Sequence, residues 1–332
     1  MRAGWCLFIV VLAGCPAKRG GTIATPPSGA GCPSASGVYV ASYVRPGDDG
    51  KGHAGWVLPL HDKQVDSIQG MEDYVVVDPA VATEAGVPAP PPNLWLMLPN
   101  GTPCKATIGG YYAAAIDAPT PNIAYGAELS GCAAPSDPSD AVAIALVSDA
   151  PPAGCQIVSP RPVAARLGER GKDNHWTRPT KDTPIPPQFA TVVPDKPCVA
   201  PACEKLWSVA QVDLAGKPVA WSGAVNWLAI PAGATPDSEC TWKAETFSGF
   251  FVASADGSPV AVPPEDPKHP LVLTAVLADA GGPKVLVAEG TGEYAAYDLD
   301  HGTAKLGRHL VWLLEGPEAY GNLDHLGPEC TQ

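Results

Sequence analysis

Short apolar runs separated by glycine, proline and aspartate fill this chain from residue 38 onward, and they restrict the folds open to it. The 35 glycines and 39 prolines together make up 74 of the 332 residues, a composition that suits many turns. Apolar residues still account for 45% of the chain, which is enough to bury a substantial core. We therefore expect a mainly β protein with many short strands.

Ten runs have the alternating or continuous apolar pattern of strands. They lie at 38–44, 74–77, 94–98, 111–116, 142–147, 220–230, 250–255, 271–277, 285–288 and 309–314. Helical periodicity is scarce, and only the segments 78–85 and 163–170 suit a short helix of about two turns.

A segment that begins at Trp95 is repeated at Trp227. WLMLPNG at 95–101 aligns without a gap with WLAIPAG at 227–233, and each is followed by Thr-Pro and then a cysteine. Further matches keep the same order, among them Gly-Tyr-Tyr at 110–112 with Gly-Phe-Phe at 249–251. Matches that occur in the same order in both halves predict an internal duplication. The alternative is that two unrelated segments share a similar composition of strands and turns. The fold class we expect is two tandem related β domains, sandwiches or open barrels, linked by disulfides.

The chain begins with a targeting pattern. Arg2 supplies a positive charge, residues 3–13 are almost entirely apolar, and Leu12-Ala13-Gly14-Cys15 ends the run. This order resembles the lipobox of bacterial lipoproteins, and the resemblance implies cleavage after Gly14 and lipid attachment to Cys15. The run is too short to span a bilayer, which needs about 20 residues. A simple cleaved signal peptide and an ordinary buried segment are the alternatives.

The same resemblance implies a location. A lipid on Cys15 would make the membrane a partner of the mature protein and hold it at the cell envelope. Pro16, and not aspartate, follows Cys15, which by resemblance to enteric lipoproteins indicates the outer membrane.

These features together divide the chain. The divisions we expect are a signal peptide (1–14), a lipidated flexible tether (15–31), a first β repeat (32–200) and a second β repeat (201–332). The first repeat carries an insertion at about 57–93 and an irregular stretch rich in proline and basic residues at 160–197. We expect the boundary between the repeats near Cys198 to Cys203.

Eight cysteines remain once Cys6 leaves with the signal and Cys15 takes lipid, and an even number in an oxidising compartment indicates disulfides. They are Cys32, Cys104, Cys132, Cys155, Cys198, Cys203, Cys240 and Cys330. A Pro-containing turn at 118–122 lies midway between Cys104 and Cys132, so a regular hairpin would pair them. The duplication instead leaves Cys132 and Cys155 without counterparts, and would pair those two.

The sequence gives little support for zinc or nucleic acid. Only Cys198 and Cys203 are close together, without a second close pair for a tetrahedral zinc site, and we expect no cofactor. The formal net charge is −13, and it becomes −14 when Arg2 leaves with the signal. Because phosphate binding needs clustered basic residues, this balance argues against nucleic acid as a partner.

The search for catalytic motifs finds no Gly-x-Ser-x-Gly, Ser-x-x-Lys or His-Glu-x-x-His. The triplet Leu-Asp-His does occur twice, and it supplies a possible metal or acid–base set: Asp300, His301, Asp324 and His325, with His309 between the triplets. Ordinary solvated turns are the alternative interpretation.

We therefore expect a membrane-anchored envelope lipoprotein with a non-catalytic binding or structural role, whose partner is an envelope protein or a glycan. The alternative is a secreted hydrolase or metal-dependent enzyme with a site near the Leu-Asp-His triplets. A binding role predicts an exposed apolar or aromatic patch, most naturally at the insertion of the first repeat.

Tryptophans are expected mainly in the core, because each begins or lies within an apolar run. The expected core residues are Trp56, Trp95, Trp221 and Trp227, whereas Trp176 lies in a polar context and is expected at the surface.

Overall fold

The computed structural model describes residues 31–44, 54–67, 75–98, 101–117, 121–135, 142–166, 169–170, 176–177, 183–200, 202–233, 243–263, 271–290, 293–300 and 302–311. The signal peptide and nearly all of the tether, including Gly14 and Cys15, lie outside these ranges. The described residues form a mainly β protein, as the sequence predicts, with three main sheets.

The first sheet closes into a six-stranded antiparallel barrel. Its members are β1 (Val38–Val44), β2 (Gly55–Gln64), β3 (Val75–Val77), β4 (Leu94–Met97), β5 (Pro103–Asp117), β6 (Pro121–Ser130) and β7 (Val142–Val147). The order is β3-β5-β4-β7-β1-β2-β6, and the additional β5–β6 pairing closes the barrel. The short strand β3 pairs with β5 outside the closed ring, and α1 (Pro79–Glu84) follows it.

Two five-stranded antiparallel sheets follow, which we call the central sheet and the outer sheet. The central sheet has the order β19 (Thr303–Val311), β18 (Glu293–Asp300), β17 (Gly282–Gly290), β16 (Val272–Asp279) and β8 (Gln156–Val158). The outer sheet has the order β15 (Pro259–Ala261), β14 (Lys243–Ala253), β13 (Lys217–Ala229), β12 (Cys203–Leu214) and β9 (Arg161–Arg166). A separate two-stranded pair joins β10 (Glu169–Arg170) to β11 (Trp176–Thr177).

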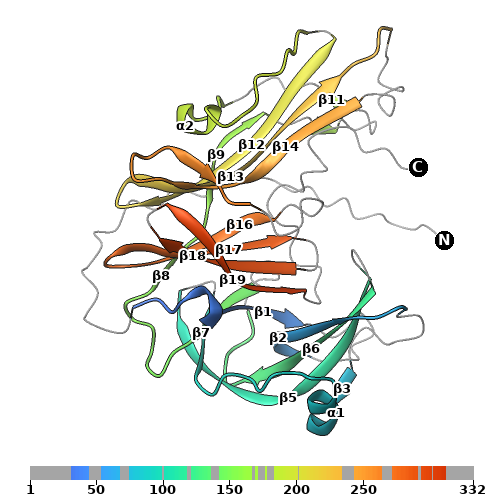
Figure 1. Cartoon of the computed structure of the whole chain (residues 1–332), viewed down its shortest axis with the longest axis vertical. Helices are drawn as coiled ribbons and strands as arrows, with labels where there is room; N and C mark the ends of the chain where they lie inside the picture. Colours follow the sequence, from blue (N-terminus) through green and yellow to red (C-terminus); the bar gives the residue numbers. More distant parts are fainter. Residues whose placement is uncertain are drawn as a thin grey trace, which may run out of the picture.

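The central sheet lies between the barrel and the outer sheet, so the molecule is a stack of layers (Figure 1). Alternate residues of β17 point to opposite faces: Val285 and Val287 belong to the core shared with the barrel, and Leu286 and Ala288 to the core shared with the outer sheet. Because both faces of the strand are covered, its apolar residues form a continuous run in place of an alternating one.

The far face of the outer sheet is covered by the segment that contains α2 (Pro187–Ala190). Phe189 of this helix is fully buried and meets Phe251 edge to face, with ring centroids 5.3 Å apart. A Cβ on Gly223 would lie only 2.7 Å from the Phe189 ring, so the close approach of helix and sheet requires glycine there. The stretch 160–197, expected to be irregular, thus includes both β9 and α2.

Most predicted strands are present, but several strands were missed and one segment was assigned wrongly. The sequence patterns did not identify β2, β12 or β18 as strands, and they indicated β6 only as the second arm of the hairpin between Cys104 and Cys132. Residues 161–166 form strand β9, so the expected helix at 163–170 is wrong; pairing with β12 outweighs the helix propensity of alanine and arginine. The helix expected at 78–85 is present as α1, and the Asp78 carboxylate caps it by accepting from the Ala80 backbone N–H at 2.8 Å.

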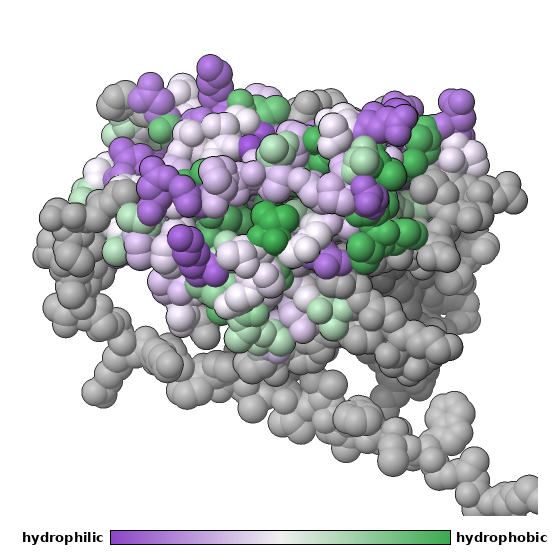
Figure 2. All heavy atoms as spheres, turned by 90° about the horizontal axis from the view of Figure 1, so that it is seen from below, coloured by the Kyte–Doolittle hydropathy of each residue, from purple (hydrophilic) through white to green (hydrophobic). Residues whose placement is uncertain are grey.

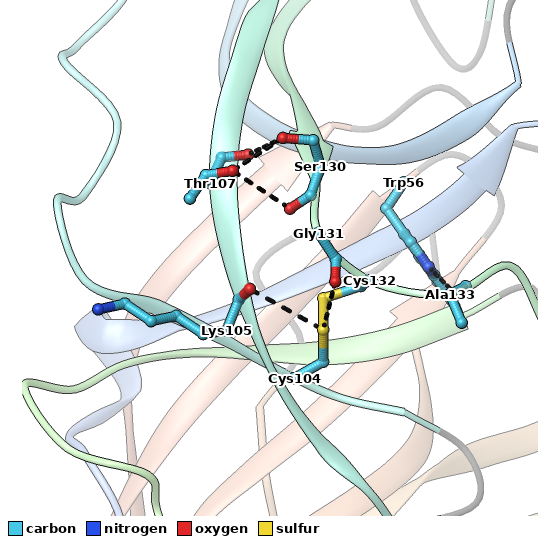
Figure 3. The surroundings of a disulfide bond; sticks show 8 residues. All are labelled: Trp56, Cys104, Lys105, Thr107, Ser130, Gly131, Cys132 and Ala133. Atoms are coloured by element: carbon cyan, nitrogen blue, oxygen red, sulfur yellow. Dashed lines mark hydrogen bonds between the residues drawn. A yellow bond between two sulfur atoms is a disulfide. The ribbon is translucent and has the colours of Figure 1, made fainter.

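The structure contains three disulfides, and one is the predicted hairpin bridge Cys104–Cys132 (Figure 3). In the β5–β6 hairpin, Asp117 pairs with Pro121. A bulge between Ile108 and Gly110 shifts the register by one residue toward the pairing of the two cysteines, whose Cα atoms are 5.7 Å apart. The rival Cys132–Cys155 pairing is therefore wrong.

The other two bridges are Cys32–Cys155 and Cys198–Cys203. Cys240 and Cys330 lie outside the described residues. Every strand of the barrel falls between Cys32 and Cys155 in the chain, and the first strand after Cys155 belongs to the central sheet. Sheet membership thus changes at Cys155, earlier than the boundary we expected near Cys198 to Cys203.

The two segments matched by the duplication occupy locally similar hairpins in differently ordered sheets. Trp95 lies on β4, which forms a hairpin with β5, and Trp227 lies on β13, which forms a hairpin with β14. However, β4 also pairs with β7, whereas β13 pairs with β12. The duplication stays a hypothesis that rests on the sequence matches.

Three of the four tryptophans expected in the core are buried: Trp56, Trp221 and Trp227 are at most 5% exposed. Trp95 is half-buried, and its indole N–H donates to the Ser148 carbonyl at 3.2 Å. The Trp176 side chain is outside what the structure describes.

Candidate functional site

A groove of about 340 Å³ lies where β9, β12 and a disulfide-closed loop meet at the end of the outer sheet. Its walls include Arg166, Cys198, Cys203, Glu204, Lys205 and Trp207. Small-molecule sites usually measure about 300–1,000 Å³, so this groove is at the lower end of that range. We name it the Arg166–Trp207 groove.

Strand pairing places the groove residues. Successive side chains of β12 alternate between the faces of the outer sheet, so Lys205 and Trp207 project to the same face. Arg166, on the neighbouring strand β9, is the register partner of Trp207. Lys205 is in turn the register partner of Trp227 on β13. Two basic side chains and an aromatic ring are thus fixed by the regular backbone of three paired strands.

Two of the residues that line the groove, Arg166 and Glu204, form an ion pair. The Arg166 Nη2 atom lies 3.2 Å from Glu204 Oε1, and the Glu204 side chain is only 7% exposed. A buried carboxylate needs a hydrogen-bonding cation, and Arg166 meets this need. The Arg166 guanidinium also lies 5.6 Å from the centroid of the Trp207 ring, within cation–π range. The Trp207 indole N–H donates to the Thr183 carbonyl at 2.9 Å, which fixes the ring orientation.

Lys205 adds a second positive charge. Its ammonium lies 5.5 Å from the Trp227 ring centroid, and Lys196 approaches the same ring at 5.0 Å. Lys196 forms an ion pair with Glu245, whereas no carboxylate among the described residues is within ion-pair distance of Lys205. Lys205 therefore brings a positive charge to the groove.

The Cys198–Cys203 disulfide closes the remaining wall. The two Cα atoms are 5.0 Å apart, and the Cys203 backbone N–H donates to the Val199 carbonyl at 3.1 Å inside the loop. A further bond, from the Ile230 N–H to the Ala202 carbonyl at 2.9 Å, ties the loop to β13. The wall is therefore held by covalent and backbone interactions, and it does not depend on side-chain packing alone.

This arrangement offers charge-assisted hydrogen-bond donors beside an aromatic ring. Guanidinium and ammonium groups bind carboxylates and phosphates strongly when they are partly desolvated, and an indole ring supplies apolar contact area. The groove therefore has the chemistry of recognition for an anionic molecule of small size.

The residues expected from the Leu-Asp-His triplets are not gathered in the described part of the chain. Asp300 pairs with Thr303 at one end of the β18–β19 hairpin, whereas His309 lies opposite Ala295. These positions are five residues apart along β18, or about 16 Å at about 3.3 Å per residue. His301, Asp324 and His325 fall outside the described residues. Among those described, no three His, Cys, Asp or Glu side chains are grouped as a metal site would need.

His309 does have an acidic partner, which the sequence did not indicate. Its Nε2 atom lies 2.9 Å from Glu293 Oε2, and the Glu293 side chain is 10% exposed. The two residues are close because Glu293 and His309 project to the same face of neighbouring strands two positions apart. This pair is one hydrogen-bonded contact within the central sheet.

Exposed valines lie on β3 and α1, within the segment expected to be an insertion at about 57–93. Val75, Val76 and Val81 are 38%, 62% and 49% exposed. Figure 2, which views the molecule from the side of β3, β5 and α1, shows hydrophobic residues gathered toward one side of this face. It is the second candidate for contact with another molecule.

Sequence reasoning missed the Arg166–Trp207 groove. Arg166 was assigned to a helix, and Lys205 and Trp207 were not singled out. The available signal was the alternation in Cys203-Glu204-Lys205-Leu206-Trp207, which predicts a strand with a basic and aromatic face.

Comparisons with known proteins give no match: no protein-family model, curated protein or solved structure is significantly similar to this chain. Within the described ranges, no helix combines the length and the apolar character needed to cross a membrane.

Proposed function

We propose that this protein is a lipid-anchored, non-catalytic binding protein of the bacterial cell envelope, held at the outer membrane by Cys15. The observation that carries the binding role is the Arg166–Trp207 groove, in which donors and an aromatic ring are fixed on paired strands and a disulfide-closed loop. Hydrogen-bond donors held on rigid elements favour binding, because a ligand then loses less free energy to the ordering of side chains.

The lipobox-like residues 12–15 support the anchor. One or two acyl chains hold a protein at a membrane, whereas a bare tether does not. The protein expressed in a diderm bacterium should therefore sediment with outer membranes and be released by detergent. The Cys15→Ser variant should appear in the soluble envelope fraction, and equal membrane binding by this variant would contradict the anchor.

The binding role is tested separately with the soluble Cys15→Ser protein. Hydrogen exchange should be compared with and without a detergent extract of bacterial envelopes. We expect slower exchange at 198–207, where the loop and the start of β12 line the groove. If exchange slows only at β3 and α1, the binding surface is the one that carries Val75, Val76 and Val81. If exchange slows at no segment, the binding role is wrong.

A further inference from the structure

We infer that the Cys198–Cys203 disulfide is a site of thiol–disulfide exchange, at which a dithiol reductant opens one wall of the Arg166–Trp207 groove. The redox state of this bridge then decides whether the wall is in place. As a regulation of the groove the inference rests on the proposed binding role, whereas the exchange itself is independent of that role.

The bridge is accessible to a thiol. Both of its cysteines line the groove, and both are only partly buried. Val199, which follows Cys198 in the loop, is 75% exposed, so the loop faces solvent. A thiolate must reach a sulfur atom of a disulfide in order to attack it, and exposed bridges are therefore the labile ones. In contrast, Cys155 of the Cys32–Cys155 bridge is 4% exposed and belongs to the core between the barrel and the central sheet.

Reduction of the bridge would release a segment of chain. The described residues between the end of α2 at Ala190 and the start of β12 at Cys203 form neither helix nor strand. Cys198 lies in this segment, so no strand pairing holds it beside Cys203. Once the bond between the two sulfur atoms is broken, Cys198 is free to leave the wall of the groove.

The contacts that would remain do not involve Cys198. They include the hydrogen bonds from Cys203 N–H to the Val199 carbonyl and from Ile230 N–H to the Ala202 carbonyl, and the ion pair between Lys196 and Glu245. The first bond lies inside the loop, and the second holds the residue next to β12. The ion pair is at the surface, where such pairs contribute little. The bridge is therefore the strongest link between the segment and β12.

The Cys104–Cys132 bridge supplies the contrast. It lies at the end of the β5–β6 hairpin, in which Thr107 pairs with Ser130, and Cys104 also pairs with Leu96 on β4. Strand pairing would keep these two thiols adjacent after reduction. Adjacent thiols have a high effective concentration and return quickly to the disulfide when a mixed disulfide forms. Reduction there should leave the backbone in place.

The exchange consists of two substitutions at sulfur. A thiolate of the dithiol bonds to one sulfur of the bridge, the bond between the two Sγ atoms breaks, and the other cysteine leaves as a thiolate. The second thiol of the reductant, as a thiolate, then attacks its own partner sulfur in the mixed disulfide and releases the second cysteine. The protein gains two electrons and the two protons of the dithiol, and the dithiol becomes a disulfide.

The first test is differential labelling of the oxidised, soluble Cys15→Ser protein. Thiols that are free at the start are blocked with N-ethylmaleimide, dithiothreitol is added, and newly freed thiols are labelled with iodoacetamide at successive times and mapped by peptide mass spectrometry. We expect Cys198 and Cys203 to be labelled at least about tenfold faster than the other bridged cysteines, because only this pair is both accessible and free to separate. Equal rates at the three bridges, or faster labelling at either of the others, would overturn the inference.

The second test is hydrogen exchange in the double variant Cys198→Ser/Cys203→Ser. Exchange at 191–200 should be at least about tenfold faster than in the protein with the bridge, because the segment opens locally. Cys104→Ser/Cys132→Ser is the matched control, and exchange at 104–107 and 128–132 should stay unchanged in it. Unchanged exchange at 191–200 in the first variant would overturn the inference. If that variant does not fold, the labelling test on the bridged protein still decides.

Both tests are independent of the proposed function, because neither uses a ligand or a membrane. A failure of the labelling or exchange result would leave the anchor and the binding role untouched. A failure of the membrane fractionation or of the envelope-extract experiment would leave the exchange chemistry of the bridge in place.

Discussion

The guanidinium of Arg308 lies over the ring of Tyr39, with its Cζ atom 3.7 Å from the ring centroid. Arg308 is on β19 of the central sheet and Tyr39 is on β1 of the barrel, so this contact joins two layers of the stack. The Arg308 Nη2 atom also donates to the Ser36 carbonyl in η1 (Ala35–Gly37). The Ala35 N–H donates to Asp298 Oδ1 at 2.7 Å, so two residues of η1 are hydrogen-bonded to the central sheet.

Replacing Arg308 should loosen this junction. Arg308→Ala removes a cation–π contact and a charge-assisted hydrogen bond, and we expect a loss of about 2 kcal/mol in the free energy of unfolding. Lys305→Ala on the same strand is the control, because Lys305 is exposed and its change should stay within about 0.5 kcal/mol. Equal urea midpoints for the two variants would contradict a structural role for the contact.

The carboxyl of Glu289 should make stability fall as the pH rises. Burial raises the pKa of Glu289 from 4.5 to about 7. Between these values the unfolded chain releases the proton while the folded protein keeps it, so folding loses up to about 3 kcal/mol as the pH rises from about 4.5 to about 7. Above that pH the loss is complete.

Glu289→Gln should therefore remove this pH dependence and stabilise the protein at neutral pH. The measurement is the free energy of unfolding at several pH values from 4.5 to 8. Glu84→Gln, at an exposed position on α1, should leave the pH profile unchanged. Parallel profiles for wild type and Glu289→Gln would show that Glu289 titrates normally in the folded state.

Gly126 should tolerate no side chain. The ring of Tyr112, which is 1% exposed, lies directly against its Cα, and a Cβ on Gly126 would overlap the ring atoms. Because Tyr112 is fully packed in the barrel wall, we expect Gly126→Ala to cost about 3 kcal/mol. Gly249→Ala is the matched control on a strand: its Cβ would lie 3.7 Å from Phe251, an ordinary contact, so little loss of stability is expected.

The three disulfides should differ in their effect on stability. Their sequence separations are 123 for Cys32–Cys155, 28 for Cys104–Cys132 and 5 for Cys198–Cys203. The loop-entropy relation then predicts losses of about 5, about 3.5 and about 2 kcal/mol on replacement by serine pairs. Denaturant unfolding of the three double variants checks this ranking, and the reverse order would show that native packing, not loop closure, sets the effect.

The sequence predicts those parts of the structure that depend on contacts between residues close together in the chain. The β5–β6 hairpin and its bridge were predictable, because a local turn and the spacing of Cys104 and Cys132 specify them. β2 was missed because Pro59 and the polar residues after it interrupt the apolar pattern, although the strand continues through a register shift there. β18 was missed although Tyr294, Ala295, Ala296 and Tyr297 form a continuous apolar run buried on both faces of the sheet, because alanine is depleted in strands and weakens the pattern.

The Arg166–Trp207 groove depends on interactions that no local pattern reveals. Arg166 meets Trp207 only because β9 pairs with β12 across more than thirty intervening residues. The loop at 198–203 supplies another part of the groove wall. A sequence pattern predicts a strand face, but it does not predict which distant strand will complete it.

The Cys32–Cys155 bridge has a mechanical consequence. The bridge joins the two ends of the chain segment that forms the barrel. A force applied to the chain before Cys32 and resisted by the central sheet would therefore pass through the disulfide to Cys155 and β8. Strands β1 to β7 lie in a covalent side loop that carries none of this tension. In an anchored protein under shear, the barrel would stay unloaded while the bridge is intact, and reduction of this single bond would place all of its strands in series with the force.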